Sequence, residues 1–448
     1  MLERKIDSYI RSYYETNRNA LLITGARQIG KTYSIREFGK TFKSFVEINF
    51  IENPNAVSVF KGAKSSSDIL LRLSAITTKP LIKGETLIFF DEVQVYPEIV
   101  TDIKFLVDEG SYRYILSGSL LGVGLKDLRS EPVGYMGVKD MYPLDFEEFI
   151  SGVGINKQII ESLRHSWENR TPVDDFIHSK MMELFRLYLV VGGLPAAVSN
   201  YIESNNLQEV MVIQQDIIRL YKRDIAQYDP KNKLNIEEIF NLIPSELNAK
   251  NKRFILKRLN EHAKYERYQN SFLWLKNAGV ALPIYNIEDP KVPLLLSHSR
   301  SLFKLFQSDI GLLAAQYAEG IQLRIIKGDK DINFGSIYEN AVAQELVAHG
   351  IEPYYYNNKK RGELDFVIEL GGRIIPIEVK SGKDYDVHRA LSNIMDCGEY
   401  ILPEAIVFNN DNLSVEGKFT YAPIYMAMFF EKSYAAPEFY KVDLSGLM

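Results

Sequence analysis

The sequence predicts an α/β protein of several domains, with a parallel sheet near its N-terminus, a helical middle region and a second α/β domain near its C-terminus. Three features lead to this prediction. An apolar strand runs into a glycine-rich loop at residues 20–32, two more apolar runs end in acidic or small residues before residue 120, and a helix precedes three strand-like runs at residues 335–383. The 448 residues exceed what one hydrophobic core accommodates, so roughly two to four domains are expected.

The first element is a strand at Ala20–Thr24, followed by the loop GARQIGKT and then by a helical pattern. This is the full spacing of a phosphate-binding loop, in which glycines let backbone amides turn toward phosphate oxygens. Lys31 would reach the β- and γ-phosphates, the Thr32 hydroxyl would bind Mg²⁺, and the helix would add its positive N-terminal end. The alternative is a chance glycine loop. The predicted nucleotide contacts are Gly25, Ala26, Arg27, Gln28, Ile29, Gly30, Lys31, Thr32 and Tyr33.

A second buried strand is predicted at Leu87–Phe90, and it ends in Asp91-Glu92. An aspartate at a strand tip can hold Mg²⁺, and the glutamate after it can polarise an attacking water. Acidic residues commonly end strands, so the pair is informative only together with the phosphate loop. With that loop it forms a Walker B element, and it predicts hydrolysis in addition to binding.

A third strand is predicted at Tyr112–Leu116, before Ser117-Gly118-Ser119. Ser117 and Ser119 are both candidates to sense the γ-phosphate, and an ordinary turn is the alternative. Three parallel strands with helical crossovers predict a three-layer nucleotide-binding domain over residues 1–150. An arginine acting in trans is also expected, and the sequence leaves three candidates open: Arg27, Arg113 and Arg129.

The middle of the chain is predicted to be helical. Residues 151–230 carry amphipathic stretches broken at Gly192-Gly193-Leu194-Pro195, which indicates a helical lid. Residues 231–300 carry three short helical patterns, at 236–243, 254–259 and 265–278, followed by the strand-like VALPIYNI; this order is typical of a winged helix. A basic cluster in this region favours either DNA backbone contact or a solvated helix face. The cluster comprises Lys250, Lys252, Arg253, Lys257, Arg258, Lys264 and Arg267.

Residues 301–448 are predicted to form the second α/β domain. A helix with Glu339 and Glu345 precedes the runs EPYYY, ELDFVIEL and RIIPIEVK, the last two joined by a Gly-Gly turn at 371–372. Because residues i and i+2 of a strand point the same way, Glu378 and Lys380 share a face that Asp365 can meet. Carboxylates and a lysine together can bind Mg²⁺ and stabilise a pentavalent phosphate, as in PD-(D/E)xK nucleases.

The predicted catalytic residues of this second site are Asp365, Glu378 and Lys380, and the predicted metal ligands are Glu339, Asp365 and Glu378, with Glu345 as the alternate to Glu339. The alternative is a hairpin whose charged face is only solvated, or a nuclease-like fold that has lost its chemistry.

The composition limits the possible partners and the compartment. A net charge of -5 gives no global attraction to nucleic acid, so a local patch would have to hold it. The single cysteine, Cys397, allows no intrachain disulfide and fits a reducing compartment. Charges interrupt the N-terminal MLERKIDSYIRSYY, and no uncharged apolar run reaches the roughly 18 residues of a membrane span. We therefore expect a cytoplasmic protein without membrane contact.

Over nearly its whole length the chain resembles a large prokaryotic family of AAA-type ATP-binding proteins, whose C-terminal domain of unknown function is similar to PD-(D/E)xK nucleases. The resemblance rests on TGARQIGKT, LIFFDEVQ, ILSGS, PVGYMGVKDMYPLDFEEF, GGLPAAV, YKRDI, FKLFQSDIGLL, GSIYENAVAQEL and GELDFVIE…IPIEVKSGK. Many relatives have a Gly-Arg pair where this chain has Pro132-Val133-Gly134-Tyr135, so the chain departs from the family at a point where an arginine finger would be expected. It implies ATPase roles for Gly30, Lys31, Thr32, Asp91 and Glu92, and a nuclease-like signature at Glu339, Asp365, Glu378 and Lys380.

The sequence therefore predicts an ATPase, dependent on ATP and Mg²⁺, whose turnover moves the C-terminal domain. Three hypotheses stay open for its purpose. The protein is an ATP-regulated nuclease or binding protein of double-stranded DNA, an ATP-dependent switch whose C-terminal domain is a protein-binding platform, or an ATPase that remodels a protein partner. The sequence does not indicate the oligomeric state.

Overall fold

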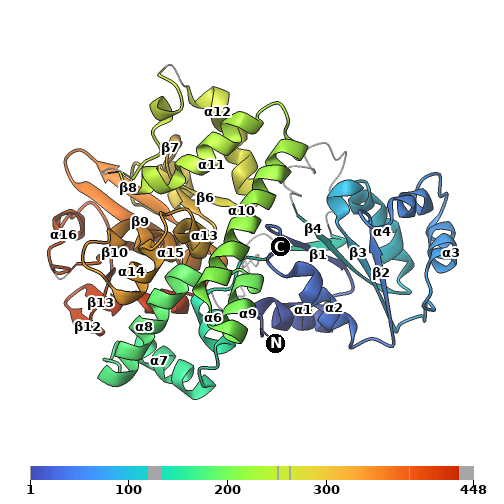
Figure 1. Cartoon of the computed structure of the whole chain (residues 1–448), viewed down its shortest axis with the longest axis horizontal. Coiled ribbons are helices and arrows are strands. Elements are labelled where there is room, and N and C mark those ends of the chain that lie inside the picture. Colours follow the sequence, from blue (N-terminus) through green and yellow to red (C-terminus); the bar gives the residue numbers. More distant parts are fainter. Residues whose placement is uncertain (1, 120–133, 250–251, 262–263, 383, 433–448) are drawn as a thin grey trace, which may run out of the picture.

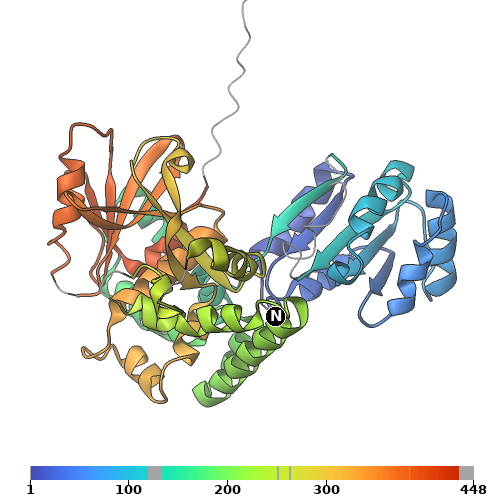
Figure 2. The ribbon, with the colours of Figure 1, turned by 90° about the horizontal axis from the view of Figure 1, so that it is seen from above.

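Two β-sheets organise the chain, and the long helix α10 (Leu207–Tyr228) lies between them (Figure 1). The structure is a computed structural model and describes residues 2–119, 134–249, 252–261, 264–382 and 384–432. Figure 2, turned by 90°, shows the two sheets in separate lobes of the molecule. Arg129 and Lys250, which the sequence analysis named, lie outside the described residues.

The N-terminal sheet is entirely parallel and has the order β2-β3-β4-β1-β5. Alternate residues of its strands enter two different cores. One core contains Leu21 and Phe89 with helices α1 and α2, and the other contains Leu22 and Phe90 with helices α3 and α4. The predicted three-layer α/β arrangement is confirmed, with two strands, β2 and β5, beyond the three predicted. The bounds are β1 Ala20–Thr24, β2 Ser44–Asn49, β3 Thr86–Asp91, β4 Arg113–Gly118, β5 Met136–Asp140, α1 Lys5–Thr16, α2 Lys31–Gly39, α3 Ser66–Ile76 and α4 Ile99–Glu109.

Helices follow the first sheet, as predicted, and the expected break at Gly192–Pro195 separates α8 from α9. Gly193 has to be glycine because a Cβ there would lie 2.0 Å from the carbonyl oxygen of Leu144. The Gly193 amide also donates to Asp309 at 2.7 Å. Among the described residues, no helix combines the length and the apolar character that crossing a bilayer requires. The bounds are α6 Phe146–Gly152, α7 Lys157–Asn169, α8 Asp175–Val191 and α9 Pro195–Ser204.

The helices and the hairpin of the predicted winged-helix region are present as α11 (Lys233–Leu247), a short 3-10 turn at Leu256–Arg258, α12 (Tyr265–Asn277), β6 (Ala281–Ile287) and β7 (His298–Gln307). The hairpin is not a free wing. Strand β6 pairs in parallel with β8, and the hairpin completes an eight-stranded sheet. Most of β6 is buried, which suits an inner strand better than an exposed wing. The predicted boundary at residue 300 therefore falls inside β7.

The second sheet is mixed and has the order β12-β13-β11-β10-β9-β8-β6-β7. The predicted hairpin at Gly371-Gly372 joins β9 and β10, and both glycines adopt positive φ angles. Helix α15, which carries Glu339 and Glu345, is buried from Ser336 to Leu346. The bounds are β8 Tyr354–Asn358, β9 Gly362–Leu370, β10 Arg373–Val379, β11 Ala405–Asn409, β12 Ser414–Glu416, β13 Phe419–Pro423, α13 Ile310–Ala315, α14 Ile321–Lys327, α15 Phe334–Ala348 and α16 Arg389–Met395.

Candidate functional site

The phosphate loop lies at the carboxyl edge of the first sheet, where β1, β3 and β4 all end. Gly25 and Gly30 have φ angles of 138° and 96°, which glycine adopts without the strain of a side chain. A Cβ on Gly25 would lie 2.2 Å from the Met141 carbonyl oxygen. Beside the loop is a cavity of about 500 Å³, which is lined by Arg27, Gln28, Gly30, Lys31, Thr32, Tyr33, Arg36, Asp91, Glu92, Gly118, Ser119 and Leu220.

Lys31 is buried and lines this cavity. Its Nζ donates to the carbonyl oxygens of Gly25 at 2.9 Å and Ala26 at 2.6 Å. Burial lowers the pKa of Lys31 to about 8. A phosphate in the loop would give Nζ charged acceptors in place of neutral ones, and such hydrogen bonds are about twice as strong.

Four hydrogen bonds hold the Asp91 carboxylate in place. Its Oδ2 accepts hydrogen bonds from the Thr32 hydroxyl at 3.1 Å and from Asn49 Nδ2 at 3.2 Å. Its Oδ1 accepts from the Ser117 hydroxyl and from the Glu92 amide. Burial raises the pKa of Asp91. The oxygens of Thr32 and Asp91 are adjacent hard donors at the cavity, a donor set that fits Mg²⁺.

Glu92 follows Asp91 in a strained conformation, with a φ of 58° that non-glycine residues seldom adopt. Its carboxylate accepts a hydrogen bond from the side-chain amide of Gln94, which also donates to Ser119 Oγ at 3.4 Å. Gln94 therefore orients the predicted water-polarising residue. Gln94 lies in the motif LIFFDEVQ, but its role was not predicted from the sequence.

The two serine candidates have different positions. Ser117 is fully buried, donates to Asp91 and does not line the cavity. Ser119 lines it and accepts a hydrogen bond from Arg27 Nε at 3.3 Å. The side chain of Ile29, another predicted contact, is buried in the core. Arg113 begins β4 and therefore lies at the opposite edge of the sheet from the loop.

Helix α10 contributes Leu220 to the lining of this cavity. Arg27 Nη1 of the phosphate loop pairs with Asp224 Oδ1 at 2.9 Å. The Tyr221 hydroxyl donates to the Arg27 carbonyl oxygen at 3.0 Å. No local pattern indicates these contacts, because Arg27 and Asp224 are 197 residues apart. The motif YKRDI contains Tyr221 and Asp224 but does not identify their partner.

The residues predicted for the nuclease-like site, apart from the alternate Glu345, lie on β9, at the end of β10 and on α15. Asp365 of β9 accepts from the Val379 amide at 2.9 Å, and Lys380 pairs with Glu378 at 2.8 Å. Two lysines that were not predicted for this site join them. Lys304 of β7 faces Glu339, Glu363 and Asp365, and Lys252 pairs with Glu339.

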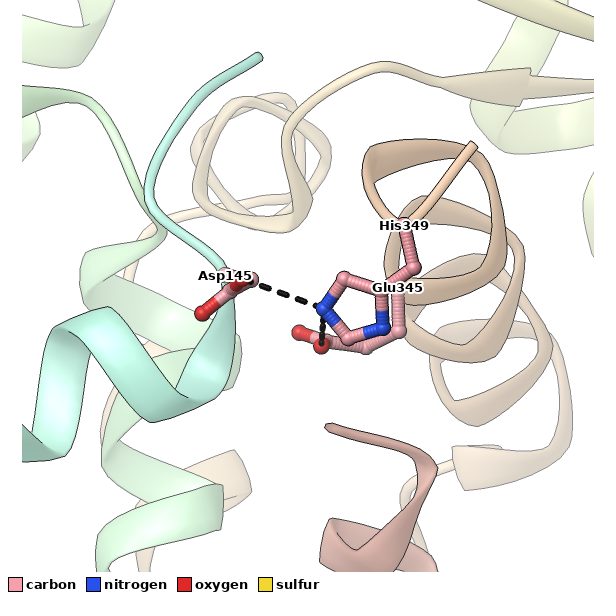
Figure 3. Close-up of side chains that lie close together, drawn as sticks. All are labelled: Asp145, Glu345 and His349. Atoms are coloured by element: carbon pink, nitrogen blue, oxygen red, sulfur yellow. Dashed lines mark hydrogen bonds and ion pairs between the residues drawn. The ribbon is translucent and has the colours of Figure 1, made fainter. Parts of the chain in front are cut away.

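Glu345, the alternate ligand, lies in a separate buried group with Asp145 and His349 (Figure 3). Its Oε1 accepts from the Phe146 amide at 2.8 Å, and His349 Nε2 lies 3.1 Å from Asp145 Oδ2. Lys5 of α1 pairs with the same Asp145 oxygen at 2.7 Å. Because an ammonium already neutralises Asp145, we assign this group to the contact between α1, the start of α6 and α15.

Residues 17–150 match the family model described as an AAA domain, and the loop, Asp91 and Glu92 lie within them. The N-terminal domain is therefore a P-loop ATP-binding domain of the AAA type. Residues 182–322 and 334–425 match models that are both described as domains of unknown function, DUF8612 and DUF4143.

Several solved structures are similar to this chain. The Walker-type ATPase paby2304 of Pyrococcus abyssi is 13% identical, with 70% of this chain and 96% of that chain covered and a TM-score of 0.41. The RuvB Holliday junction branch migration motor of Thermotoga maritima is 11% identical, with 65% and 91% covered and a TM-score of 0.28. PCH-2 of C. elegans is 12% identical, with 48% and 67% covered and a TM-score of 0.26. No curated protein matches the chain.

Stability should depend on pH through Glu345. Burial, reinforced by the Asp145 charge, raises the pKa of Glu345 from 4.5 to about 8. The folded state then holds a proton that the unfolded state releases, so the free energy of unfolding falls as the pH rises from about 5 to about 8. Thermal melts from pH 5 to pH 9 should show this fall, and Glu345→Gln, which keeps an acceptor for Phe146, should reduce it. Equal slopes in both proteins would contradict the assignment.

Proposed function

We propose that the protein hydrolyses ATP with Mg²⁺ at the loop and transmits its nucleotide state to the C-terminal region through α10. The observation that carries this proposal is the convergence of the loop, Thr32, Asp91 and Glu92 on one cavity. Binding alone would need the loop and a metal ligand. A second carboxylate at the same cavity, oriented by its own amide partner, fits an attack by water.

Each residue has a distinct role in this proposal. The loop amides and Lys31 bind the phosphates, and Thr32 and Asp91 would hold the Mg²⁺. The bound ion would neutralise charge that develops on the phosphate oxygens. Glu92 orients the attacking water and accepts its proton. Asn49 and Ser117 keep the Asp91 carboxylate directed toward Thr32.

The contact of Arg27 with Asp224 provides the route from nucleotide to α10. Arg27 lies in the loop, so phosphate oxygens and the Asp224 carboxylate are alternative partners for its guanidinium. When phosphate draws Arg27 inward, its ion pair with α10 weakens. Helix α10 also contacts α9, α11 and α13, so a shift of α10 reaches the rest of the chain.

For the C-terminal domain we propose a nuclease-like fold that serves as a platform for a protein partner. Of the basic cluster predicted to contact DNA, Lys252 is paired with Glu339, and Arg258 is paired with Glu246 at 2.7 Å. Double-stranded DNA is the second candidate partner, favoured by the exposed side chains of Lys257, Lys264 and Arg267. Stimulation of ATP hydrolysis by duplex DNA would favour the second candidate.

Replacing Glu92 by Gln should separate hydrolysis from binding. The amide cannot accept the proton of the attacking water, so the hydrolysis rate should fall by about 10²-fold or more. The affinity for ATP should stay within about threefold, because the loop and Asp91 are unchanged. Phosphate release and calorimetric titration measure the two quantities, with Glu98→Gln, an exposed carboxylate nearby, as the matched control. Hydrolysis at the wild-type rate in the Glu92 variant would refute the proposed role.

Replacing Asp224 by Asn should remove the ion pair with Arg27 and leave the Arg27 guanidinium free to bind the phosphates of ATP. We expect ATP to bind about three- to tenfold more tightly, which corresponds to about 1 kcal/mol. Hydrogen exchange in α10 should respond less to ATP than in the wild type. Asp216→Asn, an exposed change in the same helix, is the control and should alter neither quantity. If Asp224→Asn and Asp216→Asn have the same ATP affinity and hydrogen exchange, Arg27 does not transmit the nucleotide state to α10.

A further inference from the structure

We infer that Glu339 and Asp365, which were predicted to hold Mg²⁺ in the C-terminal domain, instead hold the ammonium group of Lys304, and that Glu378 holds that of Lys380. This region is then an internal ion-pair cluster that fastens the β6–β7 hairpin to the rest of the second sheet. These residues have no role in the proposed ATP hydrolysis. The ion-pair cluster and the ATPase activity can therefore be refuted independently of each other.

Lys304 occupies the place that a cation would take. Its side chain comes from β7 and is 0% exposed. Its Nζ lies 2.9 Å from Glu363 Oε1, 3.5 Å from Glu339 Oε2 and 3.7 Å from Asp365 Oδ1. A divalent ion bound by Glu339 and Asp365 would have to approach their oxygens at about 2.1 Å. The ammonium group lies within 3.7 Å of both carboxylates, so an ion at these oxygens would meet its positive charge.

Most oxygens of the predicted ligands already have a partner. Glu339 Oε1 pairs with Lys252 and Oε2 with Lys304. Asp365 Oδ2 accepts from the Val379 amide, and Oδ1 faces Lys304 at 3.7 Å. Glu378 Oε1 pairs with Lys380, and its buried Oε2 has no hydrogen-bond partner in the described structure. Mg²⁺ can bind through one or two carboxylates and several waters, but here it would have to share these carboxylates with the ammonium groups of Lys304 and Lys380, whose positive charge opposes it.

The charges lead to the same conclusion. Three ammonium groups, of Lys252, Lys304 and Lys380, face the carboxylates of Glu339, Glu363, Asp365 and Glu378. Four carboxylates and three ammonium groups leave a formal net charge of −1. A divalent cation would change this net charge to +1. A fully buried ammonium is also costly unless its carboxylates stay beside it. Lys304 and these acids therefore stabilise one another.

The cluster has a mechanical consequence. Lys304 belongs to β7, Lys252 to the segment between α11 and α12, Glu339 to α15, and Asp365 to β9. The ion pairs thus join the middle region to the C-terminal sheet from two sides. We expect these parts to move as one body when the nucleotide state changes, with the cluster as their anchor.

Binding of Mn²⁺ tests the inference on the full chain without nucleotide. Asp91→Asn serves as the background, so that the phosphate-loop site does not contribute. In that background Asp365→Asn should leave calorimetric Mn²⁺ titration unchanged, and neither protein should nick supercoiled DNA in the presence of Mn²⁺. Mn²⁺ binding or nicking that disappears with Asp365→Asn would overturn the inference.

A second variant tests the place of the ammonium directly. In the same background, Lys304→Met should gain about one Mn²⁺ per chain, and the added Asp365→Asn change should abolish that gain. Lys380→Met leaves Lys304 in position and should gain none. A folded Lys304→Met protein that binds no additional Mn²⁺ would contradict the inference. If this variant does not fold, the Asp365→Asn comparison above decides.

Discussion

The short turn of main chain between β1 and α2 has little room to change its conformation, because other parts of the chain lie against it. Three consecutive residues of this turn each contact a different part of the chain. Gly25 lies against the Met141 carbonyl, Ala26 lies against Gly279 between α12 and β6, and Arg27 is paired with Asp224 of α10. The loop that would bind phosphate is therefore also the point where the ATP-binding domain meets the middle of the chain. A change in its conformation has to be accommodated by all three neighbours.

Helix α15 connects two buried groups of charges that lie beyond this contact. Glu339 belongs to the cluster around Lys304, and Glu345 belongs to the group that includes Asp145 and His349 (Figure 3). Both groups are satisfied mainly by ion pairs within the chain, and such pairs are costly to separate when buried. They hold the C-terminal sheet to the hairpin β6–β7 on one side and to the start of α6 on the other. The phosphate cavity, by contrast, is lined by side chains that a bound ligand can contact, among them Arg27, Lys31 and Thr32.

Local patterns in the sequence were sufficient for the elements that build the first site. Strand β1 has the predicted bounds, and the Walker B strand and the β9–β10 turn were found because apolar runs and glycines report on their immediate neighbourhood. The pairing of β6 with β8, the contact of Arg27 with Asp224 and the position of Lys304 could not be predicted in this way. Each depends on residues far apart in the chain. A lysine inside a strand is expected to be exposed unless its partners are known. The sequence therefore predicted Glu339, Asp365 and Glu378 for the second site, but not the Lys304 ammonium group beside them.

Calorimetric titration of Mg·ATP into wild-type protein and into Lys31→Ala decides whether the loop binds ATP. We expect saturable binding of one ATP per chain to the wild type. In the variant, which loses the one ammonium group that lines the described cavity, the affinity should be at least about 100-fold weaker, a loss of about 2.7 kcal/mol. No measurable binding to the wild type, or equal affinity in the folded variant, would contradict ATP binding by the loop.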